Sequence, residues 1–179
     1  MQRFAAAPWP LSLKAVSIGA TVILAGVTFA LVHAVPHGTR VPFAETFGTL
    51  LVAVPAAILA GALLFVVRGY EVATDGLYVE RLLWRTEIRL DGLQRAWADP
   101  AAMRRSLRLF GNGGLYAITG VFQNRTLGRY RAFVTDPKLA VVLRFERRTV
   151  VVSPAHPLAL LGQLQLAAPA VVIGPPDGA

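Results

Sequence analysis

The chain has 179 residues, of which 55% are hydrophobic and only 16% are charged, and it carries a formal net charge of +8. Such a composition is too apolar for an ordinary soluble domain, in which about a quarter of the residues are charged. The absence of cysteine excludes disulfides, thiolate metal sites and cysteine nucleophiles. Residues 1–67 hold three Lys or Arg and one Glu, whereas residues 68–179 hold fifteen Lys or Arg and nine Asp or Glu. We therefore expect an apolar N-terminal part followed by one basic domain, which at about 110 residues can bury a core.

Two apolar segments near the N-terminus predict a membrane-spanning helical hairpin. The first, residues 13–35, reads LKAVSIGATVILAGVTFALVHAV, and the second, residues 47–67, reads FGTLLVAVPAAILAGALLFVV. Each is long enough, because about 20 helical residues cross the hydrocarbon core of a bilayer. Residues 1–12 then form a short N-terminal segment and residues 36–46 an external loop. Pro55 is expected to kink the second helix.

A cleaved signal peptide is the alternative interpretation of the first segment. Arg3 and Lys14 could form its basic region, and Val32-His33-Ala34 is a tolerable cleavage site. The apolar run is longer, however, than the roughly 7–15 residues of a signal peptide, and a second span follows it closely. The sequence therefore favours the hairpin.

Basic residues beside the two spans predict their orientation. Arg3 and Lys14 precede the first span and Arg68, Arg81 and Arg85 follow the second, whereas the connection holds a single Arg. Because the cytoplasmic flanks of membrane helices are enriched in Lys and Arg, both ends of the chain are expected in the cytoplasm.

Small residues at four-residue spacing form faces on both predicted spans. They are Ala53, Ala57 and Gly61 on the second span and the pairs Ala15-Gly19 and Gly26-Ala30 on the first. Such faces let helices approach closely, and we expect them to pack the hairpin together, with homo-oligomerisation as the alternative. Neither span carries a charged residue in its interior, so a transporter is not expected.

Seven short strands are predicted after the second span. The first two flank Asp75-Gly76, a strong hairpin dipeptide, and the chain is expected to turn into a loop after Asp91. The predicted strands are Tyr70–Thr74, Leu77–Leu82, Trp84–Leu90, Gly114–Thr119, Gly128–Thr135, Leu139–Phe145 and Thr149–Val152. Their near-regular spacing indicates a barrel or a sandwich.

A helical pattern follows the last predicted strand. Leu158, Leu161 and Leu164, with Leu160 as a further candidate, recur on one side up to about Ala167. Residues 168–179 contain three prolines and no consistent pattern, and they are expected to form a flexible tail. Seven strands and one amphipathic helix are the element order of a pleckstrin-homology (PH)-like barrel, in which the helix closes one open end.

Two further stretches are similar to a known group of proteins. FGNGGLYAITGVFQNRTLGRYRAFVTD and KLAVVLRFERRTVVVSP resemble the bacterial PH-domain families that are found behind paired membrane helices. The resemblance covers residues 70–165, and we assign the domain to residues 68–167. It implies a PH-like barrel and membrane association, but not phosphoinositide binding. The predicted fold class is a membrane α-helical hairpin plus an all-β PH-like barrel of about seven strands, closed by a C-terminal α-helix.

Arginines are the candidate site residues of the domain. A patch for anionic lipid or a partner is predicted from Arg104, Arg105, Arg108, Arg125, Arg129 and Arg131. If the segment is helical, Arg104 and Arg108 share one face. At a membrane surface each such residue contributes about 1 kcal/mol to the attraction for anionic lipid. A solvated basic surface is the alternative, and nucleic acid is not expected, because no basic helix or aromatic pair accompanies the charge.

No catalytic residue, cofactor or metal ion is predicted. The glycine run Gly111–Gly114 is followed by an expected strand instead of the Lys and helix of a P-loop, so it is expected to be a tight turn. His33 and His37 have helical spacing, but Pro36 interrupts the helix between them. His156 is expected in a loop. No HExxH, GxSxG or paired-carboxylate motif occurs, so the chain is not expected to be an enzyme.

Together these features predict a non-enzymatic binding or scaffolding module, presented by its anchor at the cytoplasmic face of a bacterial inner membrane. The expected partners are the bilayer itself, another membrane or membrane-proximal protein, and anionic lipid. Anchoring would raise the effective concentration of even a weak contact. An accessory subunit of a larger membrane enzyme or transporter is the alternative.

Overall fold

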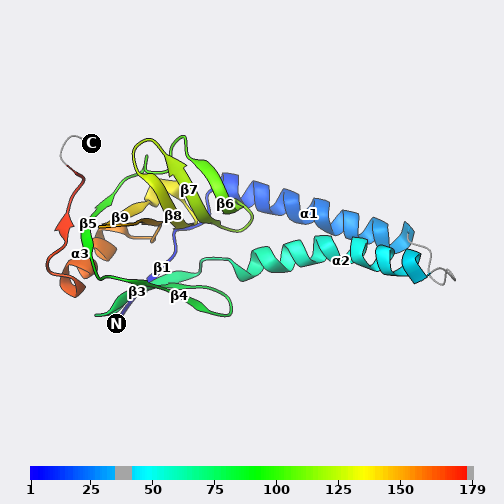
Figure 1. Ribbon diagram of the computed structural model, residues 1–179, viewed down its shortest axis with the longest axis horizontal. Helices are drawn as coiled ribbons and strands as arrows, with labels where there is room; N and C mark the ends of the chain where they lie inside the picture. The colour runs from blue at the N-terminus through cyan, green and yellow to red at the C-terminus, as the bar shows by residue number, and fades with distance from the viewer. Residues whose placement is uncertain (35–41, 177–179) are drawn as a thin grey trace.

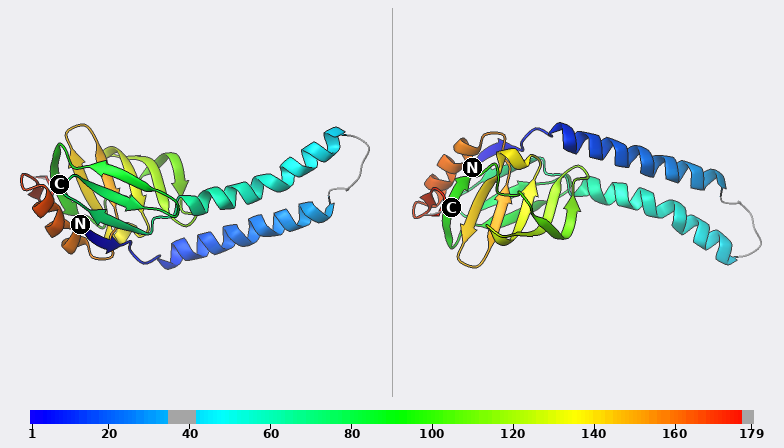
Figure 2. Two further views of the ribbon diagram at one scale, coloured as in Figure 1. Left: turned by 90° about the horizontal axis from the view of Figure 1, so that it is seen from below. Right: turned by 90° about the horizontal axis from the view of Figure 1, so that it is seen from above.

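The computed structural model describes residues 1–34 and 42–176. Figure 1 shows a β-rich domain from which two long helices, α1 (Leu11–Ala34) and α2 (Pro42–Leu64), extend in the same direction. Figure 2 shows from two further sides that they run side by side and antiparallel. Because α2 begins at Pro42, the predicted loop is too long at its C-terminal end, and its other residues lie outside the described ranges.

Both helices are apolar, but they differ in the length of the apolar stretch that the structure describes. Within the described residues, Leu11–His33 is the one helix that is long and apolar enough to cross a membrane. The apolar stretch Val52–Leu64 of α2 is shorter, so the second span stays a prediction. Helix α2 continues through Pro55.

The small-residue faces do not hold the two helices together as expected. A Cβ atom added at Gly19, Gly26 or Gly61 would have no other atom within 4 Å. These glycines therefore lie on open helix surface, and the helices contact each other through other positions. The alternative, association with another helix, stays a prediction.

The first sheet joins the two ends of the helical pair. It is antiparallel, has the order β1-β2-β3-β4, and consists of β1 (Gln2–Ala5), β2 (Gly69–Val72), β3 (Gly76–Glu80) and β4 (Arg85–Arg89). The turn at Asp75-Gly76 is confirmed by the pairing of Val72 with Leu77. Strand β1 was not predicted, because four residues before an apolar helix carry little strand signal. It pairs with β2 from Gln2 opposite Val72 to Ala5 opposite Gly69.

The second sheet has seven strands in the order β11-β5-β9-β10-β8-β7-β6. These are β5 (Leu93–Ala98), β6 (Leu107–Gly113), β7 (Ile118–Asn124), β8 (Gly128–Val134), β9 (Val141–Phe145), β10 (Thr149–Val152) and β11 (Val172–Ile173). A short 3₁₀ helix, η1 (Pro137–Leu139), precedes β9, and α3 (Pro157–Ala167) follows β10, as the helical pattern predicted.

Four expectations about this sheet are wrong. The residues expected to form a loop after Asp91 form β5, and the tail contains β11, which pairs in parallel with β5. The predicted strand Gly114–Thr119 is largely the connection between β6 and β7, and the glycine run before it lies mostly within β6. The glycines mislead because Gly111 and Gly120 are cross-strand partners with positive φ. They permit close backbone approach instead of a turn.

The two sheets are not closed into the predicted barrel. Strand β1 occupies the edge of β2, and no strand pairing links the two sheets among the described residues. Instead the chain after β1 bridges them, since Ala6 N donates to Arg68 O and Ala7 N donates to Ser153 O at 3.3 and 2.8 Å. The main core lies between the sheets, and α3 contributes Leu160, Leu161 and Leu164 to it.

Candidate functional site

The structure places the six predicted arginines in several different surroundings, and their action as one patch stays a prediction. The segment that holds the first three is not helical: residues 101–105 form turns, with Arg105 at a φ of 53°, and β6 begins at Leu107. Arg104 lines a shallow hollow with Pro100 and Phe122, whereas Arg125 and Arg129 are exposed around the β7–β8 turn. Only two members, Arg108 and Arg131, line the same cavity.

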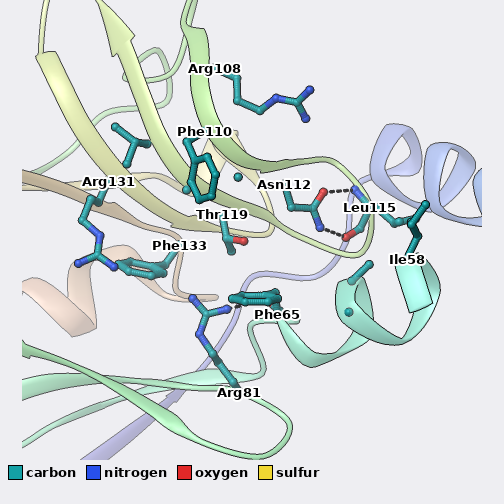
Figure 3. A pocket seen from close by; sticks show the side chains of 15 residues that line it. Ile58, Phe65, Arg81, Arg108, Phe110, Asn112, Leu115, Thr119, Arg131 and Phe133 are labelled. Atoms are coloured by element: carbon teal, nitrogen blue, oxygen red, sulfur yellow. Dashed lines mark hydrogen bonds between the residues drawn. The ribbon is translucent and has the colours of Figure 1, made fainter. Parts of the chain in front are cut away.

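This cavity lies where α2 meets the seven-stranded sheet, and it has a volume of about 500 Å³. Figure 3 shows the end of α2 on one side and strands β6 to β8 on the other. Its apolar lining consists of Ile58, Gly61, Ala62, Phe65, Phe110, Leu115, Val121 and Phe133. Ile58 and Phe110 are 48% and 78% exposed, so the cavity opens beside the helix. We call it the α2–β8 cavity.

Arg81 is the most buried charge of the α2–β8 cavity, with 8% exposure. Its Nη1 donates to the backbone oxygen of Phe65 at 2.8 Å, and its Nε donates to Thr86 Oγ1 at 3.1 Å. Its guanidinium carbon lies 5.2 Å from the ring centroid of Phe65 and 5.3 Å from that of Phe133. Attraction between a cation and aromatic rings stabilises this arrangement.

Arg131 brings a second positive charge to the same ring. Its guanidinium carbon lies 5.2 Å from the Phe133 centroid, so two cations lie beside one side chain. Burial, and then the charge of Arg131, lower the pKa of Arg81. Figure 3 shows Arg108 farther out, with its guanidinium directed away from these two.

No carboxylate neutralises these charges in the described part of the chain. The ion pairs there lie on the first sheet or in the turn after it, and they join Arg3 and Arg85 to Glu71 and Glu80, and Arg89 to Asp91. Arg81, Arg108 and Arg131 have no carboxylate oxygen within 4.0 Å among the described residues. The α2–β8 cavity therefore combines an apolar lining with uncompensated positive charge.

The turn between β6 and β7 is closed by a side chain and is not a phosphate cradle. Asn112 Oδ1 accepts hydrogen bonds from the backbone N–H groups of Gly114 and Leu115 at 3.2 and 2.9 Å, and its Nδ2 donates to Leu115 O. Two of these bonds are drawn in Figure 3. The Gly114 and Leu115 amides that a phosphate would need are already engaged, although the tight turn predicted at Gly111–Gly114 begins only at Gly114, after β6.

The same turn fixes the domain to α1. Tyr116 N donates to Ser17 Oγ at 2.9 Å, and the Tyr116 hydroxyl lies 2.6 Å from Thr21 Oγ1. The ring of Trp9 lies 6.0 Å from that of Tyr116. These contacts, together with the bond between Arg81 and Phe65, attach the domain to both helices.

A second hairpin presents apolar side chains on the helix side of the domain. Between β3 and β4, Leu82, Leu83 and Trp84 are 49%, 74% and 38% exposed. Figure 1 shows this hairpin and the β6–β7 hairpin extending toward the helices. Exposed apolar residues grouped in this way mark a surface for a membrane or a partner.

The structure gives no indication of a metal or catalytic site at the two histidines that it describes, His33 and His156. His33 is exposed and its Nδ1 lies 2.9 Å from Phe29 O, while His37 lies outside the described residues. His156 precedes α3 at the N-cap position without a capping side-chain bond. Within the described ranges no group of three or more His, Cys, Asp or Glu could hold a metal ion.

Arg81 was missed as a site residue because sequence reasoning used it only for orientation. Its signal was present: an Arg directly after an alternating strand and before Leu82-Leu83 has an unusual apolar environment. The sequence could not predict the contact between Arg81 and Phe133, because Phe133 lies on the distant strand β8.

The architecture defines a class: a two-sheet β-domain with a C-terminal helix, attached to a pair of apolar helices. Residues 68–167, more than half of the chain, match the family described as bacterial PH domain, and the chain belongs to this family. The resemblance noted in the sequence is thus confirmed. PH domains are generally non-catalytic binding modules for proteins or lipids, and membership indicates a binding or scaffolding role. Comparison with curated proteins and with solved structures found no match.

Proposed function

We propose that this protein is a non-enzymatic binding module held at the cytoplasmic face of a bacterial inner membrane by a hairpin of two spans. The observation that carries the proposal is the pairing of β1, which precedes α1, with β2, which follows α2. Paired strands lie on one side of a membrane. If α1 crosses the bilayer, the chain must therefore cross back before β2, and α2 is the segment available to do so.

The surface of the helices supports a lipid environment. Large apolar residues of α1, among them Ile18, Ile23 and Phe29, are 65–67% exposed. On α2, Leu50 and Val54 are 57% and 54% exposed. Exposed apolar surface of this extent is rare on soluble monomers. In a bilayer the same surface is favourable, because lipid tails are as apolar as the side chains.

The role of the N-terminal segment argues against cleavage of the first helix. Phe4 and Ala7 are buried in the domain, with exposures of 8% and 2%. The backbone oxygen of Ala7 accepts a hydrogen bond from Thr135 Oγ1 at 2.7 Å. Cleavage after Ala34 would remove β1 and these contacts, so the proposal retains the whole hairpin.

The basic charge and the apolar hairpin tips support contacts with anionic lipid or a membrane-proximal protein. The test is extraction and flotation of the full chain. We expect the full chain to resist extraction from membranes by alkaline carbonate. After reconstitution into vesicles, the domain should recruit a partner or anionic lipid. Release by carbonate would contradict anchoring.

An accessory subunit of a larger membrane complex is the second candidate. It is favoured by the open faces at Gly19 and Gly26 of α1, which leave room for another helix. Purification in mild detergent separates the two candidates. A larger partner in fixed stoichiometry supports the subunit, whereas a monomer or homodimer contradicts it.

A further inference from the structure

We propose that the α2–β8 cavity binds one anionic phospholipid, with the phosphate at Arg81 and Arg131 and an acyl chain along Gly61 and Ala62 of α2. The inference rests on the proposed membrane anchoring and specifies the ligand and its site.

The charge of the cavity selects an anion. Arg81 is buried, the exposed Arg131 lies beside the same Phe133 ring, and neither has a carboxylate oxygen within 4.0 Å among the described residues. A buried charge without an ionic partner is unfavourable, and an anion that binds both guanidinium groups offsets that cost. The two described bonds of Arg81 use Nη1 and Nε, so the donors of Nη2 are available. Phosphate oxygens accept such donors in pairs.

The lining of the cavity selects an amphiphile over a free anion. Away from the arginines its walls are aliphatic and aromatic side chains of α2 and of strands β6 to β8. A volume of about 500 Å³ falls within the usual range of small-molecule sites, about 300–1,000 Å³. Inorganic phosphate would leave most of this apolar surface uncovered.

The position of the cavity selects the bilayer as the source. Its helix wall, Ile58 to Ala62, lies in the last two turns of α2, directly before the chain enters the domain. This is the level at which headgroups meet acyl chains if α2 spans the membrane. The exposed Leu82 and Leu83 of the neighbouring hairpin can enter the same zone. A lipid thus reaches the cavity laterally, beside Ile58.

The experiment uses the full chain in nanodiscs and in mild detergent, and it measures retained lipid by native mass spectrometry. Phosphatidylglycerol is the anionic probe and phosphatidylcholine the neutral one. We expect one phosphatidylglycerol per chain. Arg131→Gln should weaken its retention roughly tenfold or more, because a hydrogen bond between two charged groups is lost. The matched control, Arg147→Gln, removes an exposed arginine that lies outside the cavity and outside the predicted basic patch, and it should change nothing.

A second pair of variants tests the acyl-chain part of the site. A side chain at Gly61 enters open space and lines the cavity, so Gly61→Leu should occlude it without a clash. Gly26→Leu is equally unobstructed but lies outside the cavity, and it should retain the lipid. Arg81→Gln would also remove the hydrogen bond to Phe65 O, which joins the domain to the end of α2, so the inference is tested on Arg131 and Gly61.

The outcomes separate the sources of the anion and the two proposals. Glycerophosphate or inorganic phosphate should not displace the lipid at millimolar concentration; displacement would overturn the acyl-chain contact. Equal retention of both phospholipids, binding unaffected by Gly61→Leu, or occupation by an acidic peptide or a second copy instead of lipid would overturn the inference. If the protein resists carbonate extraction yet retains no lipid, the inference fails and the anchoring stands. If it is extracted, the anchoring fails.

Discussion

The pair Gly111 and Gly120 provides a sharp test of how the β6–β7 hairpin is built. A Cβ atom added at Gly120 would lie 2.1 Å from Phe110 O and 2.8 Å from Gly111 Cα, both backbone atoms of the facing strand. Its φ of 141° is also strained for any residue with a side chain. Strain of this kind costs about 1–3 kcal/mol, and overpacking costs about 1–3 kcal/mol more. Gly120→Ala should therefore destabilise the protein by about 2–6 kcal/mol.

The assay is thermal unfolding of the detergent-purified protein, followed by circular dichroism. Gly162→Ala is the matched control: Gly162 lies in α3, where an added Cβ meets nothing within 4 Å. Since Ala is a better helix former than Gly, this variant should be stabilised by about 0.5–1 kcal/mol. Equal melting temperatures for Gly120→Ala and the unmodified protein would refute the close approach of the strands.

Three further predictions concern hydrogen bonds. Tyr70 donates to Phe133 O and is fully buried, and burial raises its pKa to about 12 from 10.0. Because the folded state holds the Tyr70 proton more tightly than the unfolded state, the resulting stabilisation is complete below pH 10 and is lost, by about 3 kcal/mol, as pH rises through 12. The melting temperature of Tyr70→Phe should lack this loss at high pH. The same pH dependence in Tyr70→Phe and in the unmodified protein would contradict the prediction. Tyr116→Phe loses the bond to Thr21 and should cost about 1 kcal/mol, more than Tyr78→Phe, whose bond is exposed; the reverse order of melting temperatures would contradict the docking on α1. Asn112→Ala should cost about 2 kcal/mol and speed amide exchange at the turn, whereas Asn112→Asp retains the acceptor and should lose less; equal exchange in both would contradict the capping role.

Local signals in the sequence identified the elements whose formation depends on neighbouring residues. The hairpin at Asp75-Gly76 and α3 from Pro157 were predicted because turn chemistry and a leucine period suffice for them. The same holds for the strong apolar pattern of α1. The family resemblance added the PH-like character of the domain.

Elements that depend on a distant partner were not predicted. Strands β1 and β11 are too short to show a pattern, and each forms because an edge of β2 or β5 is available far along the chain. Gly111 was read as a turn residue, because sequence cannot distinguish a turn glycine from one that permits close strand contact. The six-arginine patch stays a prediction, but the sequence could not indicate which arginines line the α2–β8 cavity, because that depends on the strand register, which places Arg131 opposite Val121.

The central claim, a two-span hairpin with the domain on the cytoplasmic side, is tested most directly by labelling single cysteines with a membrane-impermeant maleimide. The chain has no native cysteine, so each introduced thiol reports one position. Gln2→Cys precedes α1 and Gln123→Cys lies exposed in β7; both should react in inverted membrane vesicles and stay unlabelled in intact cells, whereas Gly38→Cys should do the opposite. Labelling of Gln2→Cys and Gln123→Cys from opposite sides would contradict the account, because β1 could not then pair with β2.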